Sequence, residues 1–136
     1  MSLPLGTAEK ERSILIIDND PSILRTLNRI LSKAGYAVDL ARSGIEGVEK
    51  FSVKSYDAVI IDVGLGDMQG TDLLPQMQRV APRMLRIILT GTPMPESTLD
   101  MAKRDADIFM LKPAKPEALI RILKENLRSQ DSWVSK

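Results

Sequence analysis

Apolar residues along this chain gather into five short runs, each nearly continuous and each bounded by polar or turn-forming residues. Runs of this length and continuity are typical of strands buried on both faces of a sheet. They occupy residues 13–17, 36–41, 56–61, 85–89 and 108–111. The pattern therefore predicts five strands.

Between these runs, apolar residues recur at the spacing of amphipathic helices. Asp20 followed by Pro21 predicts a capped helix start, and Gly35 predicts the end of that helix. Ser43 and Glu46 have the spacing of a capping box and predict the start of a second helix. The remaining helices are predicted over residues 71–80, 96–104 and 116–127.

The regular alternation of strands and helices predicts an α/β fold with a single doubly wound, five-stranded parallel sheet and five helices. The length of 136 residues fits one domain of ordinary size. We assign residues 13–128 to this domain and residues 1–12 to a flexible N-terminal arm. Residues 129–136 are assigned to a tail or to the start of a linker.

The composition narrows the chemistry that the chain can perform. It has no cysteine and no histidine, which excludes disulfides, thiolate chemistry, serine triads and the usual zinc ligands. A net charge of +1 gives no sign of direct nucleic-acid or membrane binding. No apolar run is long enough to span a bilayer, so a cytoplasmic location is expected.

Polar residues with a shared chemistry stand where four of the predicted strands end. These residues are Asp18, Asp62, Thr90 and Lys112. In doubly wound sheets, ligands bind beyond the carboxyl ends of the strands. Two carboxylates suit a hard cation such as Mg²⁺, and a lysine and a hydroxyl suit phosphoryl oxygens. Each residue alone is more often a turn, cap or solvated side chain. Together they favour phosphate chemistry.

At this point the sequence resembles the response-regulator receiver family of two-component signalling. The resemblance covers roughly residues 12–128 and rests on several motifs in a fixed order. They are ILIIDNDPS with Asp18, YDAVIID with Asp62, GLGDMQG with Gly70, IILTG with Thr90, and FMLKP with Lys112. The resemblance implies a flavodoxin-like sheet with strand order 2-1-3-4-5.

The resemblance also implies the chemistry of the site. Asp62 would be the phosphoacceptor, attacking a phosphohistidine on a histidine kinase or phosphotransfer protein. Asp18 and Asp62, with the Gly64 backbone carbonyl, would hold Mg²⁺, and Lys112 would pair with the acceptor and then with the phosphoryl group. The protein would not be an enzyme beyond its own phosphorylation and dephosphorylation.

The family also implies a switch. Thr90 would move toward the phosphoryl oxygens and Phe109 would turn inward behind it. This coupling would alter the face built from the fourth helix, the fifth strand and the fifth helix. That face would be read by a downstream protein, or by an output domain that this chain does not include. A homodimer is left open.

Some positions depart from the family pattern. Asn19 stands where the family keeps a second acid, so Mg²⁺ binding should be weaker there. Gly64 and Gly66 should loosen the loop beside Asp62, whereas Pro93 and Pro95 should stiffen the loop after Thr90.

Two alternatives remain from the sequence. Asn19 is compatible with a degenerate receiver that binds proteins without phosphorylation. Asp18-Asn19-Asp20 also matches the first motif of haloacid-dehalogenase-type phosphatases, although Pro21 marks Asp20 as a helix cap. The phosphatase would leave Asp62 without a role.

Overall fold

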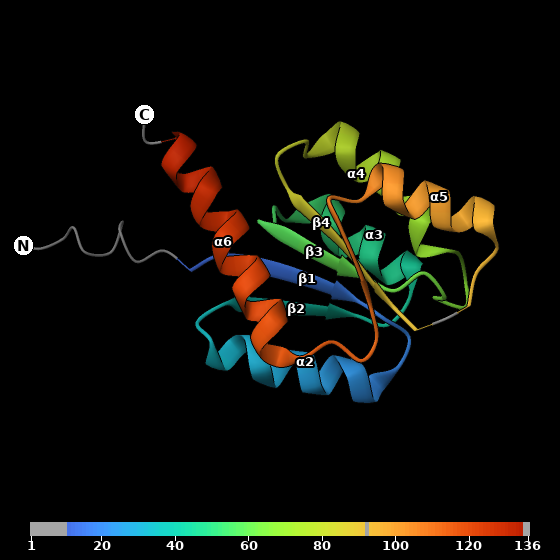
Figure 1. Cartoon of the computed structure of the whole chain (residues 1–136), viewed down its shortest axis with the longest axis horizontal. Helices are drawn as coiled ribbons and strands as arrows, with labels where there is room; N and C mark the ends of the chain where they lie inside the picture. Colours follow the sequence, from blue (N-terminus) through green and yellow to red (C-terminus); the bar gives the residue numbers. More distant parts are fainter. Residues whose placement is uncertain (1–10, 92, 135–136) are drawn as a thin grey trace, which may run out of the picture.

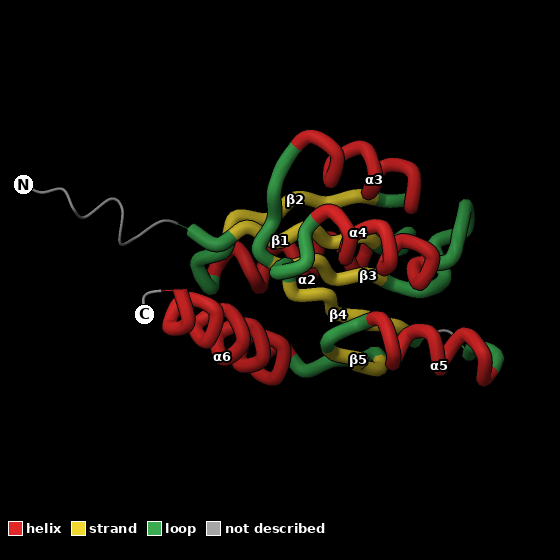
Figure 2. The backbone as a smooth tube through the Cα atoms, turned by 90° about the horizontal axis from the view of Figure 1, so that it is seen from above, coloured by secondary structure: helices red, strands yellow, loops and turns green. Residues whose placement is uncertain are grey.

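The computed structural model describes residues 11–91 and 93–134, of which 128–134 are described as backbone only. Five parallel strands form one sheet in the order β2-β1-β3-β4-β5, which confirms the predicted fold class (Figures 1 and 2). The strands are β1 (Ser13–Ile17), β2 (Ala37–Ala41), β3 (Ala58–Ile61), β4 (Leu85–Thr90) and β5 (Ile108–Leu111).

Helices cover both faces of the sheet. The helices are α2 (Pro21–Lys33), α3 (Gly44–Val53), the short 3-10 helix η1 (Gly70–Leu73), α4 (Leu74–Val80), α5 (Glu96–Asp105) and α6 (Pro116–Val134). Figure 1 shows α2 and α6 on one side of the sheet and α4 and α5 on the other. None of the described helices is long and apolar enough to cross a membrane.

Alternate residues of the strands point to opposite faces of the sheet and contribute to two separate hydrophobic cores, one on each face. On one face, Leu15, Val59 and Ile88 pack in a cluster with apolar residues of α3, α4 and α5. On the other face, Ile16 and Ile60 pack in a cluster with the leucines of α2 and α6. The central strands are therefore buried on both sides, as their continuous apolar runs predict.

The pairing register aligns the carboxyl ends of the strands at one edge of the sheet. Ile17 of β1 pairs with Ile61 of β3, and Ile61 pairs with Ile88 of β4. Thr90, the last residue of β4, pairs with Leu111 of β5. The residues that follow these ends therefore gather in one place.

The helix starts agree with the sequence signals. The Asp20 side chain accepts a hydrogen bond from the Ser22 amide, and Pro21 occupies the first turn of α2. Ser43 accepts from the Glu46 amide, as the predicted capping box requires, whereas the Glu46 side chain accepts from the amide of Arg42, one residue before the Ser43 cap.

The largest difference from the predicted boundaries is at the end of the chain. Helix α6 continues to Val134, so residues 129–134, expected as a tail or linker, extend the helix. No glycine or proline follows Leu127 to end it. Residues 135–136 of that segment, and residues 1–10 of the predicted N-terminal arm, lie outside the described residues.

The predicted helix over 71–80 also differs in detail. It begins as η1, with Pro75 in the first turn of α4.

In the predicted N-terminal arm, Arg12 contacts the carboxylate of Asp57 and the backbone oxygen of Leu127. The described end of the predicted arm is therefore tied to the base of the sheet.

Candidate functional site

The structure brings together the four predicted strand-end residues. Asp18 and Asp62 directly follow β1 and β3, Thr90 ends β4, and Lys112 directly follows β5. Their approach is set by backbone hydrogen bonds. The Asp62 amide donates to the Ile17 carbonyl at 3.0 Å, and the Lys112 amide donates to the Thr90 carbonyl at 3.0 Å.

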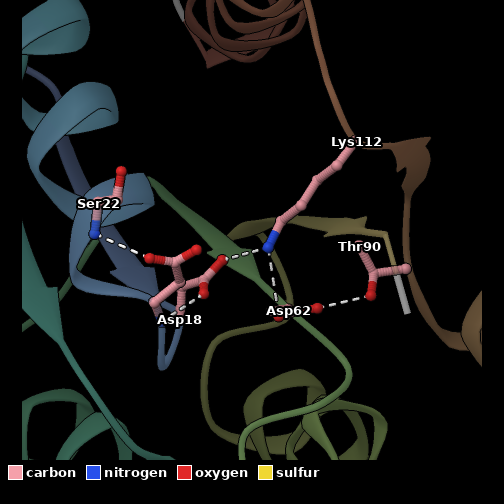
Figure 3. Close-up of polar contacts among 6 residues, drawn as sticks. Asp18, Ser22, Asp62, Thr90 and Lys112 are labelled. Carbon is pink, nitrogen blue, oxygen red and sulfur yellow. Dashed lines mark hydrogen bonds and ion pairs between the residues drawn. The ribbon is translucent and has the colours of Figure 1, made fainter.

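Lys112 and Thr90 both contact the carboxylate of Asp62 (Figure 3). Lys112 Nζ lies 2.8 Å from Asp18 Oδ2 and 3.3 Å from Asp62 Oδ2, so one ammonium group bridges two carboxylates. The Thr90 hydroxyl donates to Asp62 Oδ1 at 2.5 Å. Both oxygens of Asp62 therefore have a partner within the site.

The site holds two buried carboxylates and one ammonium group, so it carries more negative than positive charge. Asp18 is 3% exposed and Asp62 is 5% exposed, and Lys112 is the only cation that pairs with either of them among the described residues. Burial raises the pKa of Asp18, although the Lys112 ammonium and the Asp20 amide act in the opposite direction.

The lysine responds to the same environment. Burial alone would lower the pKa of Lys112, but its hydrogen bonds and charge contacts with Asp18 and Asp62 outweigh burial and raise it. Lys112 is therefore charged at neutral pH. It offsets only one of the two carboxylate charges, which leaves the site suited to a further cation.

A hard divalent cation fits the donor set, although the set is weak. No group of three acidic, histidine or cysteine side chains that could hold a metal exists among residues 11–91 and 93–127. Asn19 takes the place of a third acid and is exposed. A Cβ atom added at Gly66 would lie 3.7 Å from the Asn19 side-chain nitrogen, so Asn19 stands opposite the loop after β3.

The other candidate residues fall into two groups. Asp20, which a phosphatase of the haloacid-dehalogenase type would need beside Asp18, is occupied as the cap of α2. Phe109 is partly buried and packs against the core cluster on the α3, α4 and α5 face. It is paired with Ile88 in the β4–β5 ladder and lies outside the Asp62 contacts.

Backbone hydrogen bonds cross the base of the loop after Asp62. Gly64 and Gln69 form an isolated bridge, and the Gly70 amide donates to the Val63 carbonyl at 2.8 Å. Gly70 is required for close approach, because a Cβ atom there would lie 2.1 Å from the Asp62 carbonyl oxygen. Gly66, with a φ of 90°, lies in the left-handed region.

The tip of this loop contains a residue that the sequence did not single out. Asp67 Oδ1 accepts a hydrogen bond from the Gly44 amide, and Oδ2 accepts one from the Ile45 amide, both at 2.9 Å. These two amides hold the pKa of Asp67 below its usual range. Because both partners are backbone groups more than twenty residues away, no sequence motif marks the contact.

Comparison with known proteins places this geometry in a family. The sequence profile described as "Response regulator receiver domain" matches residues 14–124. The transcriptional regulatory protein GlrR of Escherichia coli K12 is 31% identical over 120 residues, which make up 88% of this chain and 27% of GlrR. The chain thus spans about a quarter of the length of that relative.

Solved structures of response regulators also resemble this chain. A CheY-like response regulator receiver domain protein from Methanospirillum hungatei JF-1 superposes with a TM-score of 0.85 and 32% identity, covering 90% of this chain and 98% of that one. A response regulator from Burkholderia pseudomallei with a phosphorylated aspartic acid, a calcium ion and citrate gives a TM-score of 0.76 and 25% identity. This match covers 90% of our chain and 72% of that chain. The chain therefore belongs to the response regulator receiver domain family of two-component signalling.

Proposed function

We propose that this receiver domain accepts a phosphoryl group on Asp62 from a histidine kinase or phosphotransfer protein and changes shape in response. The observation that carries the proposal is the convergence of Lys112 and Thr90 on the two oxygens of a buried Asp62. A phosphorylated aspartate with a calcium ion in the Burkholderia pseudomallei response regulator gives independent support. The phosphohistidine lies outside these 136 residues, because they contain no histidine.

In the proposed transfer, a carboxylate oxygen of Asp62 attacks the phosphorus of a phosphohistidine. The P–O bond to Asp62 forms while the P–N bond to the imidazole breaks, and the electron pair of that bond leaves with the imidazole. Mg²⁺, when bound, would neutralise charge on the phosphoryl oxygens. Asp18, Asp62, the Gly64 carbonyl and the weak ligand Asn19 would hold it.

Lys112 and Thr90 have distinct parts in this proposal. Lys112 would stay charged and move its contact from the Asp62 carboxylate to the arriving phosphoryl oxygens. A phosphoryl group on either Asp62 oxygen removes one of the two hydrogen bonds that this carboxylate now accepts. Thr90 would then bond to the phosphoryl group, with Phe109 following it inward.

The proposed output is a change in the face formed by α5, β5 and α6. Thr90 lies at the end of β4, next to β5, and the segment after it leads into α5. A downstream protein or an output domain would read this face. The relative GlrR is named a transcriptional regulatory protein, and an output on transcription is the corresponding proposal for this chain.

A degenerate receiver that acts without phosphorylation is the second candidate, and the neutral Asn19 beside Asp18 favours it. The two carboxylates of the site face a single lysine, and the need for a second positive charge distinguishes the two candidates. A working receiver needs Mg²⁺ to balance the two carboxylates, whereas a binding module that works without phosphorylation does not.

Intact mass after incubation with acetyl phosphate tests the proposal. With Mg²⁺, the wild type should gain one phosphoryl group, and Asp62→Asn should gain none. Without Mg²⁺, the gain should be lost or strongly slowed. If the wild type gains no mass and also fails to bind beryllofluoride in the presence of Mg²⁺, the degenerate module is the better description.

A further inference from the structure

The loop from Val63 to Gly70 is held at its base by its own backbone and at its tip by contacts with another element. Its base is closed by the Gly64–Gln69 bridge and the Gly70–Val63 hydrogen bond beside Asp62. Its tip reaches the start of α3, where the Asp67 carboxylate accepts the Gly44 and Ile45 amides at 2.9 Å each.

The contact at the tip is apolar as well as polar. Gly44 is buried, and a Cβ atom added there would lie 2.4 Å from the Met68 side chain. The side chain of Met68 therefore fills the space that a larger residue at position 44 would take. Two consecutive loop residues, Asp67 and Met68, fix the tip against α3.

Helix α3 does not need Asp67 in order to begin. Ser43 accepts from the Glu46 amide at 3.0 Å, and Glu46 accepts from the Arg42 amide at 2.6 Å, so local side chains already cap the start of the helix. Asp67 bonds the Gly44 and Ile45 amides, which these local caps leave without a partner. Its long-range contact therefore ties the loop to the start of the helix in addition to capping it.

Asp67 also closes a ring of contacts around the two site carboxylates. The Asp18 amide donates to the Ala41 carbonyl at 3.0 Å, and the chain runs from Ala41 into Gly44 at the start of α3. Asp67 joins Gly44 to the loop, and the loop leads back to Asp62. The Asp62 amide completes the ring by donating to the Ile17 carbonyl, next to Asp18.

We infer that Asp67 is a positioning residue that holds the Gly64 carbonyl in place beside Asp18 and Asp62. The inference rests on the proposed function, because Gly64 matters there as a candidate Mg²⁺ ligand. Residues that hydrogen-bond a metal ligand commonly change metal affinity or activity by about ten- to a hundredfold when replaced. Asp67 acts on Gly64 through the intervening loop residues, so the lower end of that range is expected. Loss of Asp67 should therefore act on the Mg²⁺ requirement.

Asp67→Ala removes both hydrogen bonds, and Asp67→Asn removes the charge while leaving one acceptor oxygen. Asp72→Ala is the matched control. Asp72 is an exposed acid in η1 of the same region, and its carboxylate makes no hydrogen bond or ion pair among the described residues. Hydrogen exchange of the Gly44, Ile45 and Gly70 amides reports the anchor without any phosphorylation.

Acetyl phosphate labelling at a series of Mg²⁺ concentrations gives the second measurement. Asp67→Ala should speed exchange of these amides and raise the Mg²⁺ concentration for half-maximal labelling by about tenfold. Asp67→Asn should fall between Asp67→Ala and the wild type, and Asp72→Ala should match the wild type. Because unfolding would itself raise the apparent Mg²⁺ requirement, the comparison is made at a temperature where circular dichroism shows every variant to be fully folded without Mg²⁺.

Two results would overturn the inference. Unchanged amide exchange in Asp67→Ala would show that the contact does not hold the loop. Faster exchange with an unchanged Mg²⁺ requirement would leave Asp67 as a purely structural residue. Absence of labelling in the wild type would instead count against the proposed function, and the exchange result would still decide whether Asp67 anchors the loop.

Discussion

Asp39 on β2 has a pKa below its usual value because it accepts a hydrogen bond from the Tyr56 hydroxyl at 2.7 Å. The ammonium of Lys54, 3.0 Å away, acts in the same direction, whereas partial burial opposes it. Folding thus favours the charged form of Asp39. The stability that it contributes is present above the unfolded pKa of 3.8 and is lost as the pH falls below it.

Asp39→Asn should therefore lower the free energy of unfolding at pH 7 and flatten its fall in acid. The expected loss is below about 1 kcal/mol, because solvent screens a pair this exposed. Urea unfolding of both proteins between pH 7 and about pH 2.5 measures the difference. Equal stabilities at pH 7 that diverge in acid would contradict the assigned sign.

The site residues differ in how well the sequence around them predicts their roles. Asp18, Asp62, Thr90 and Lys112 could be predicted because a parallel sheet brings the carboxyl ends of its strands to one edge. Asp67 could not be predicted, because its partners are backbone amides of a helix distant in sequence. The sequence also did not predict that the Lys112 ammonium bridges both carboxylates, because residue spacing does not give the distances between these side chains.

Among the elements, β4 carries a buried cation that ties together two helices and the neighbouring strand. Arg86 is 5% exposed and donates to Gln78 of α4 at 2.8 Å and to the backbone oxygen of Asp105, the last residue of α5, at 3.1 Å. It also pairs with Asp107, just before β5, at 3.6 Å. Arg86 therefore fixes the C-terminal end of α5.

Arg86→Met should lower the free energy of unfolding by about 1–3 kcal/mol, because it removes the hydrogen bonds that a buried charged donor makes. Arg79→Met is the control, since Arg79 is exposed on α4 and has no ion pair among the described residues. Chemical denaturation measures both variants. Equal effects of the two substitutions would show that the Arg86 contacts add nothing beyond the volume of the side chain.

Element boundaries were predictable where a local signal exists. Asp20 and the pair Ser43 and Glu46 mark the starts of α2 and α3 within the sequence itself. The end of α6 at Val134 has no such signal, since neither glycine nor proline interrupts it. The 3-10 turn before α4 likewise has no local signal; it begins at Gly70, which lies against the Asp62 carbonyl oxygen.

For the whole molecule, the excess negative charge at the strand ends links cation binding to stability. Asp18 and Asp62 are buried with one lysine between them, so a cation that binds the folded protein should stabilise it. Mg²⁺ at ten times its dissociation constant contributes about 1.4 kcal/mol. For a domain of this size, that corresponds to a rise in the melting temperature of about 3–5 °C.

Asn19→Asp should reach this rise at a lower Mg²⁺ concentration, because a third carboxylate adds charge at the exposed side of the site. Asp18→Asn should abolish the rise. Thermal unfolding of the three proteins, from no Mg²⁺ to about 20 mM, measures the linkage, and equal ionic strength with Na⁺ controls for screening. A rise that survives in Asp18→Asn would place the cation elsewhere on the protein and remove Mg²⁺ from the proposed reaction at Asp62.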